Sequence, residues 1–126
     1  MEPKIIVIDP SDFSRRLTVE MLEDLNFTVM GEANSLERAQ EIIKNVYCNI
    51  CLVDMNLGEI SGIEFCENLT ENNEGLGVIL TTYLTLEKLK IDAILSGAID
   101  VLEHPIDKKS LEKSIIYVQK TITEKE

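Results

Sequence analysis

The chain has 126 residues, which suits one compact domain with a substantial buried core. Hydrophobic residues make up 44% and charged residues 28% of the sequence, as in folded globular proteins rather than disordered ones. The net charge of −11 repels phosphate backbones and anionic membranes, so direct binding of this domain to nucleic acid or to a membrane is not expected.

The first part of the chain alternates short apolar runs with segments of helical periodicity. The run 5–8 is continuously apolar, which predicts a strand buried on both faces. Either Ser11 or Asp12 can cap the helix that follows, which extends to about residue 25. A second strand is predicted at 27–30, closed by Gly31.

The same alternation continues through the middle of the chain. Apolar residues at helical spacing predict a helix over 36–46, with Asn34 and Glu37 placed like a capping pair. The apolar run 50–53 predicts a third strand, and a third helix is expected around 63–69.

The last part of the chain repeats the pattern twice more. A strand is predicted at 78–80, a helix at 86–94 with Gly97 as its C-cap, a strand at 99–102 and a helix at 111–122. The apolar residues at helical spacing are expected to lie in the core first: Leu86, Leu89, Ala93 and Ile94 in the first of these helices, and Leu111, Ile115, Val118 and Ile122 in the second. Any that remain exposed would form a partner or dimer face together with the fifth strand.

Five strands alternating with five helices predict an α/β sandwich around a parallel sheet. In such sheets, functional groups gather beyond the carboxyl ends of the strands, near the switch in strand order. Four of the predicted strands end in residues with carboxylate, hydroxyl or imidazole groups, which are common in functional sites: Asp9, Asp54, Thr82 and His104. The sequence therefore predicts one site at this edge of the sheet.

The three cysteines point to a reducing compartment. Cys48, Cys51 and Cys66 make an odd number, no secretory signal precedes them and no apolar stretch is long enough to span a bilayer, so we expect a cytoplasmic protein with free thiols. Cys48 and Cys51 have the spacing of a redox motif, but Cys51 lies in a predicted buried strand rather than at a helix start. We therefore interpret the cysteines as small buried hydrophobic residues.

From residue 4 to about residue 122, the chain resembles the receiver domain of response regulators in two-component signal transduction. The main motif is 52–62, Leu-Val-Asp-Met-Asn-Leu-Gly-Glu-Ile-Ser-Gly, which is similar to the family's acceptor aspartate, loop and glycine. The pairs Arg15-Arg16 and His104-Pro105 and the run 96–98 also fall at family-like offsets. The resemblance implies a flavodoxin-like three-layer sandwich with strand order 2-1-3-4-5.

The resemblance also implies the roles of the site residues in a phosphorelay. Asp54 would be the phosphoacceptor, so the protein would become a phosphoprotein that carries an aspartyl phosphate. Mg²⁺ would bind Asp9, Asp54 and the main-chain carbonyl of Asn56. The Thr82 hydroxyl would contact the phosphoryl group, and Pro105 would follow a cis peptide bond. The implied partners are a sensor histidine kinase or phosphotransfer protein, and a second copy bound through helix 4, strand 5 and helix 5.

Several residues make this an atypical receiver. Pro10 replaces a second acid that generally binds the metal, so Mg²⁺ binding should be weakened or absent. His104 replaces a lysine that would contact the phosphoryl group, and an imidazole is shorter and mostly neutral near neutral pH. In the switch region, Val101 replaces an aromatic residue, and Tyr83 replaces a small one. Tyr83 either covers the acceptor pocket in part or takes over some of the aromatic's role.

The sequence is compatible with three functional hypotheses. The first is a phosphorylatable receiver with an incomplete metal site, which is not itself an enzyme. The second is a phosphorylation-independent pseudo-receiver that acts as a protein-interaction module. The third is a small hydrolase with Asp54 as nucleophile, although Asn56 stands where such enzymes place a second acid. We expect residues 1–126 to form one domain, with 121–126 either a natural terminus or the start of a linker to a C-terminal effector.

Overall fold

The computed structural model describes residues 2–58 and 60–124, so one position of the 52–62 motif and the end of the charged stretch 121–126 lie outside it. The strands are β1 (Lys4–Ile8), β2 (Thr28–Ala33), β3 (Ile50–Asp54), β4 (Gly77–Thr82) and β5 (Asp100–Glu103). The helices are α1 (Asp12–Asp24), α2 (Leu36–Asn45), α3 (Gly62–Asn72), α4 (Glu87–Leu95) and α5 (Lys108–Glu124). None of these helices combines the length and apolar character that a membrane crossing requires.

The five strands form one parallel sheet in the order β2-β1-β3-β4-β5. This order confirms the flavodoxin-like fold predicted from the sequence. The chain moves from β1 to one edge of the sheet with β2 and then returns to the other side of β1 with β3. The strand order therefore switches between β1 and β3, where open α/β sheets place their sites.

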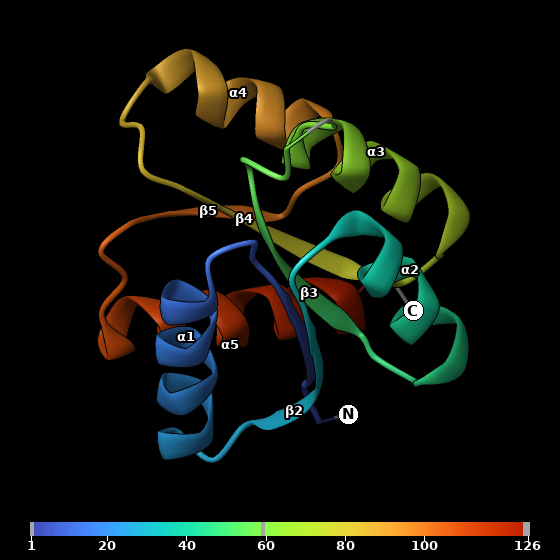
Figure 1. Cartoon of the computed structure of the whole chain (residues 1–126), viewed down its shortest axis with the longest axis vertical. Helices are drawn as coiled ribbons and strands as arrows, with labels where there is room; N and C mark the ends of the chain where they lie inside the picture. Colours follow the sequence, from blue (N-terminus) through green and yellow to red (C-terminus); the bar gives the residue numbers. More distant parts are fainter. Residues whose placement is uncertain (1, 59, 125–126) are drawn as a thin grey trace.

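The sheet is covered by helices on both faces, which gives three layers (Figure 1). Successive side chains of a strand point to opposite faces, so Ile6 and Ile8 pack with Phe65 of α3, whereas Ile5 and Val7 pack with Leu111 of α5. Helices α2, α3 and α4 cover the first face, and α1 and α5 cover the second. Burial on both faces explains why the strands are continuously apolar.

The second strand continues past Gly31, so its predicted end is wrong. Gly31 pairs with Ile6 directly after the register between β1 and β2 shifts, which makes this position part of a bulge. A Cβ atom on Gly31 would lie 3.1 Å from the Ile42 side chain of α2. The glycine therefore allows a close approach of helix and strand inside β2 instead of ending the strand.

The predicted capping pair of α2 is also wrong. The N-cap is Ser35, whose side chain accepts a hydrogen bond from the Arg38 N–H at 3.2 Å. Because α2 begins at Leu36, Asn34 lies one residue too early for the role, and Glu37 is not its partner.

The two last helices differ in how much of their apolar surface is buried. The predicted core residues of α5 are buried, as expected: Leu111, Ile115, Val118 and Ile122. In α4 the buried residue is Ala93, while Ile94 and the preceding Leu86 are half exposed or more. The core prediction is therefore confirmed for α5 and wrong for most of α4, which leaves an apolar face in solvent.

Candidate functional site

The predicted site residues come together at the carboxyl edge of the sheet. Asp9 directly follows β1 and Asp54 ends β3, and the residues before these two acids pair across the neighbouring strands. Thr82 ends β4, and His104 directly follows β5. The His104 N–H donates to the Thr82 carbonyl oxygen at 2.7 Å, which fixes the end of β5 against β4.

Three of these residues form a compact cluster of potential metal ligands. One side-chain donor atom each from Asp9, Asp54 and His104 lie within 4.8 Å of one another. Asp9 is 4% exposed and Asp54 is 7% exposed. Burial raises the pKa of Asp54, the nearby Asp9 carboxylate raises it further, and the Asn56 N–H opposes both effects. The cluster therefore holds negative charge at an electrostatic cost.

Main-chain N–H groups orient both carboxylates. The Ser11 N–H donates to Oδ1 of Asp9 at 2.9 Å, and the Asn56 N–H donates to Oδ1 of Asp54 at 2.7 Å. In each case the donor is two residues after the acid, a turn that aspartate commonly forms. The Ser11 side chain also caps α1, because its Oγ accepts from the Ser14 N–H at 3.2 Å. Ser11 therefore links the end of β1 to the start of α1 through these two hydrogen bonds.

The loop after Asp54 is closed by Gly62 at the start of α3. The Gly62 N–H donates to the Met55 carbonyl oxygen at 2.8 Å. A Cβ atom at Gly62 would collide with the Asp54 carbonyl oxygen and would lie 2.6 Å from Cα of Met55. The loop can therefore fold against Asp54 in this way only if residue 62 has no side chain.

Thr82 lines the same hollow as Asp54 at this edge of the sheet. The residue is buried, and its Oγ1 accepts a hydrogen bond from the Leu84 N–H at 3.0 Å. Since the oxygen is already an acceptor, its own hydrogen is left to donate to a third group.

Tyr83 lies over His104 rather than in the core. Its ring stacks on the imidazole with the ring centroids 4.1 Å apart and the planes 13° from parallel, while Tyr83 is 65% exposed. The His104 Nε2 atom is buried and has no hydrogen-bond partner among the described residues. The peptide bond between His104 and Pro105 is cis. Tyr83 thus shields one face of the imidazole from solvent.

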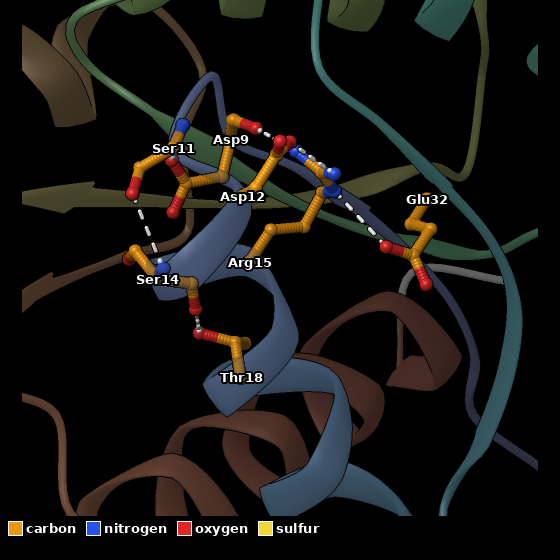
Figure 2. Close-up of polar contacts among 7 residues, drawn as sticks. All are labelled: Asp9, Ser11, Asp12, Ser14, Arg15, Thr18 and Glu32. Atoms are coloured by element: carbon orange, nitrogen blue, oxygen red, sulfur yellow. Dashed lines mark hydrogen bonds and ion pairs between the residues drawn. The ribbon is translucent and has the colours of Figure 1, made fainter.

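Arg15 forms an ion-pair network behind Asp9 that the sequence analysis did not identify (Figure 2). Its Nη1 donates to the Asp9 carbonyl oxygen at 2.9 Å, its Nη2 to Asp12 at 2.7 Å and its Nε to Glu32 at 3.0 Å. Asp12 is therefore engaged by Arg15, and its side chain is 85% exposed. It is not one of the three residues in the Asp9, Asp54 and His104 cluster.

Val101 occupies a packed position in β5. It pairs with Leu80 of β4 and is partly buried against the core cluster beneath α3 and α4. On the same side, Lys90 of α4 forms an ion pair with Glu103 of β5 at 2.6 Å. The position that the resemblance assigns to a mobile aromatic thus holds a short branched side chain.

A hollow of about 720 Å³ opens beside Asp54, between the loop after β3 and the loop after β4. It is lined by Asp54, Met55, Asn56, Leu57, Gly58, Ile60, Ser61, Ile63, Glu64, Thr82, Tyr83, Leu84 and Leu89. A small molecule can therefore reach the Asp54 carboxylate from this side.

The cysteines lie away from this edge and are free. Cys51 and Cys66 are buried, as predicted, whereas Cys48 is only partly buried. A hydrogen bond to Cys48 and complete burial raise the pKa of Cys51 well above its usual value. Cys51 lies within β3, so the pair is not at a helix start, where redox motifs place their reactive thiol.

The residues present fit Mg²⁺ only in part. Mg²⁺ prefers oxygen ligands, and the two carboxylates of Asp9 and Asp54 supply them. Pro10 adds no side-chain ligand, and the third donor of the cluster is the imidazole of His104. The donor set of this cluster is therefore two carboxylates and one ring nitrogen.

Comparisons with known proteins agree with this geometry. The family model for the response regulator receiver domain matches residues 5–116. The DNA-binding transcriptional activator DevR/DosR of Mycobacterium tuberculosis is 30% identical over 75% of this chain, but the match spans only 44% of that protein. The chemotaxis protein CheY of Thermotoga maritima is 22% identical, with 95% of this chain and all of that protein covered.

The fold of this chain is also similar to that of a solved receiver domain structure. The CheY-like receiver domain protein of Methanospirillum hungatei superimposes with a TM-score of 0.88 at 19% identity, with both chains fully covered. At this identity the similarity concerns the fold alone. The family model covers most of the chain, and the carboxyl edge of the sheet carries paired acids after β1 and β3. The chain therefore belongs to the response regulator receiver domains of two-component signal transduction.

Proposed function

We propose that this receiver domain accepts a phosphoryl group on Asp54 in a phosphorelay. The observation that supports the proposal is the pair of buried carboxylates, Asp9 and Asp54, with Thr82 lining the same hollow as Asp54. An acid that merely ended a strand would not need a second buried acid facing it, because the pair raises the electrostatic free energy of the folded state. Such a cost is typical of a functional site.

The chain's own groups suit an in-line transfer. A carboxylate oxygen of Asp54 bonds to phosphorus while the bond from phosphorus to the donor atom breaks, and the donor leaves with the bonding electron pair. The Thr82 hydroxyl, held by the Leu84 N–H, donates to a phosphoryl oxygen. When bound, Mg²⁺ supplies positive charge that offsets the crowded anionic oxygens. Asp9, Asp54 and the main-chain carbonyl of Asn56 would hold it.

We infer that this machinery works below the strength of a complete site. Pro10 supplies no ligand, and the carboxylate of Asp12 is occupied by Arg15. His104 offers a hydrogen bond to the phosphoryl group but less positive charge than a lysine would. We therefore expect transfer to need a high Mg²⁺ concentration.

The phosphodonor protein is proposed to dock beside α1. Phe13 and Leu17 of this helix are 66% and 47% exposed, which is unusual for large apolar side chains next to a polar site. They line a hollow of about 270 Å³ that also includes His104 and Pro105. We propose that a sensor histidine kinase or phosphotransfer protein covers these residues, which brings its phosphohistidine to Asp54.

We also propose that the exposed apolar side of α4 contributes to a homodimer with β5 and α5. Ile91, Ile94 and Leu95 are 52%, 50% and 79% exposed. If this face joins two copies, Leu95→Asp lowers the mass measured by sedimentation from dimer to monomer. A wild-type chain that stays monomeric at all concentrations would exclude the dimer.

Phosphorylation is tested with acetyl phosphate and intact mass measurement over a range of Mg²⁺ concentrations. The wild-type protein should gain the mass of one phosphoryl group, and Asp54→Asn should gain none. Asp12→Asn is the matched control, because it removes a nearby carboxylate that Arg15 already holds. No adduct on the wild-type protein at any Mg²⁺ concentration would exclude the proposal.

A second candidate function is phosphorylation-independent binding of a partner. It is favoured by Pro10, which removes a ligand, and by Tyr83, which is stacked on His104 beside the acids. It predicts that Asp54→Asn leaves the signalling output of the intact regulator unchanged. Loss of that output in Asp54→Asn would favour the phosphorelay instead.

A further inference from the structure

The imidazole of His104 is placed with the two carboxylates as a donor group. One of its ring nitrogens lies within 4.8 Å of a carboxylate oxygen of Asp9 and of Asp54. Its Nε2 atom is buried and lacks a hydrogen-bond partner among the described residues, although buried polar atoms are normally paired. Tyr83 covers one face of the ring, which limits where the imidazole can turn.

The alternative interpretation is that His104 is a loop residue without a function. Such a residue would turn its polar atoms toward water, because burying an unpaired nitrogen costs about 1–3 kcal/mol. In this chain Nε2 is instead buried, and one of the two ring nitrogens lies within 4.8 Å of a carboxylate oxygen of each acid. An unpaired nitrogen in an imidazole that lies with two acids is explained if a bound group completes the bonding of this side chain.

The chemistry of the three donors selects the kind of group. Two carboxylates and one imidazole match a borderline divalent transition-metal ion better than Mg²⁺, because imidazole suits Zn²⁺, Fe²⁺ or Ni²⁺, whereas Mg²⁺ retains oxygen ligands. Donors bound tetrahedrally to Zn²⁺ at about 2.1 Å lie about 3.4 Å apart. Donor atoms within 4.8 Å are therefore at most about 1.4 Å farther apart than the donors of such a zinc site.

We propose that Asp9, Asp54 and His104 form a binding site for Zn²⁺ or a similar borderline cation, in which His104 is a direct ligand. Three protein ligands leave the fourth tetrahedral position to water, as in open zinc sites. The site does not require phosphorylation of Asp54. It makes the histidine at this position a determinant of metal preference and not merely a weaker phosphoryl contact.

The experiment uses the fact that the chain has a single histidine. NMR spectra of protein labelled with ¹⁵N-histidine then contain one imidazole, whose two nitrogens are recorded during separate titrations with Zn²⁺ and Mg²⁺. We expect Zn²⁺ at about one equivalent to shift the resonance of one ring nitrogen strongly, as direct coordination requires, and Mg²⁺ to leave it nearly unchanged. An imidazole that does not respond to saturating Zn²⁺ would refute the site.

Calorimetric titration of variants identifies the ligands. His104→Gln should lower Zn²⁺ affinity at least about tenfold and change Mg²⁺ affinity much less, and Asp54→Asn should also lower Zn²⁺ affinity. Asp12→Asn is the control for charge, and Cys48→Ser is the control for zinc bound by the thiols; both should keep the wild-type response. Zinc binding that survives His104→Gln but is lost in Cys48→Ser would overturn the proposal.

Discussion

Replacing Asp54 by asparagine should stabilise the folded protein at neutral pH in the presence of a chelator. The substitution keeps the shape of the side chain, and its amide oxygen can still accept the Asn56 N–H bond that Asp54 accepts at 2.7 Å. It removes one of two buried carboxylates whose oxygens lie within 4.8 Å of each other. The new amide group can also donate a hydrogen bond to Asp9.

The size of the effect follows from that separation. Two unit charges 4.8 Å apart repel by about 3.5 kcal/mol at an effective dielectric constant of about 20. The charge of Arg15 behind Asp9 and the partial access of water reduce this value, so we expect a gain of about 1–2 kcal/mol. For a chain of this length, the gain corresponds to a rise in Tm of about 4–8 °C.

The stabilisation by Asp54→Asn should be larger at neutral pH than at acidic pH. The pKa of Asp54 is raised in the folded state by burial and by Asp9, so this group contributes most to stability when it is protonated. Its contribution is lost as the pH rises through the folded pKa. The advantage of Asp54→Asn should therefore be full at about pH 7.5 and should shrink toward about pH 4.

Urea unfolding at both pH values, followed by circular dichroism, measures the difference. Asp12→Asn serves as the control, because that carboxylate is 85% exposed and pairs with Arg15 at the surface. We expect its free energy of unfolding to change by less than about 0.5 kcal/mol. If Asp54→Asn is no more stable than wild type at neutral pH without metal, the two acids do not repel each other as inferred.

Three further predictions follow from the same edge of the sheet. Gly62→Ala should destabilise the fold by about 3 kcal/mol in urea unfolding, because its Cβ would meet main-chain atoms. The control Gly75→Ala, at a position with a φ of 83° and open space around it, should lose only about 1 kcal/mol. Equal losses would contradict the close packing of the loop. Pro10→Asp combined with His104→Lys should strengthen Mg²⁺ binding in calorimetry, and an unchanged affinity would show that these positions are assigned wrongly. Tyr83→Ala should shorten the lifetime of the Asp54 phosphoryl group in time-resolved intact mass spectra, because water gains access over the exposed imidazole; an unchanged lifetime would exclude a covering role.

The strand order and the location of the site could be predicted because they depend on patterns that local sequence contains. Continuously apolar runs such as 5–8 and 50–53 mark strands buried on both faces, and each is followed by its acid. Parallel strands bring their ends to one edge whatever the details of the loops, so Asp9 and Asp54 had to meet if the fold was right.

The parts that could not be predicted depend on contacts between distant segments. Arg15 and Asp12 are three residues apart, which suggests an ion pair, but Glu32 joins them only because β2 lies beside β1. The stacking of Tyr83 on His104 depends on the conformation of two loops. Hydrophobic periodicity also places Ile94 on an apolar helix face without indicating that this face is left in solvent.

The most direct test of the central claim is a crystal structure of the protein with Mg²⁺ and beryllium fluoride as a phosphoryl analogue. We expect the analogue on a carboxylate oxygen of Asp54, with the Thr82 hydroxyl donating to a fluoride and the metal held by Asp9, Asp54 and the Asn56 carbonyl. Asp9 and Asp54 side chains pointing away from each other, or an analogue bound elsewhere, would contradict the assignment of Asp54 as the phosphoacceptor.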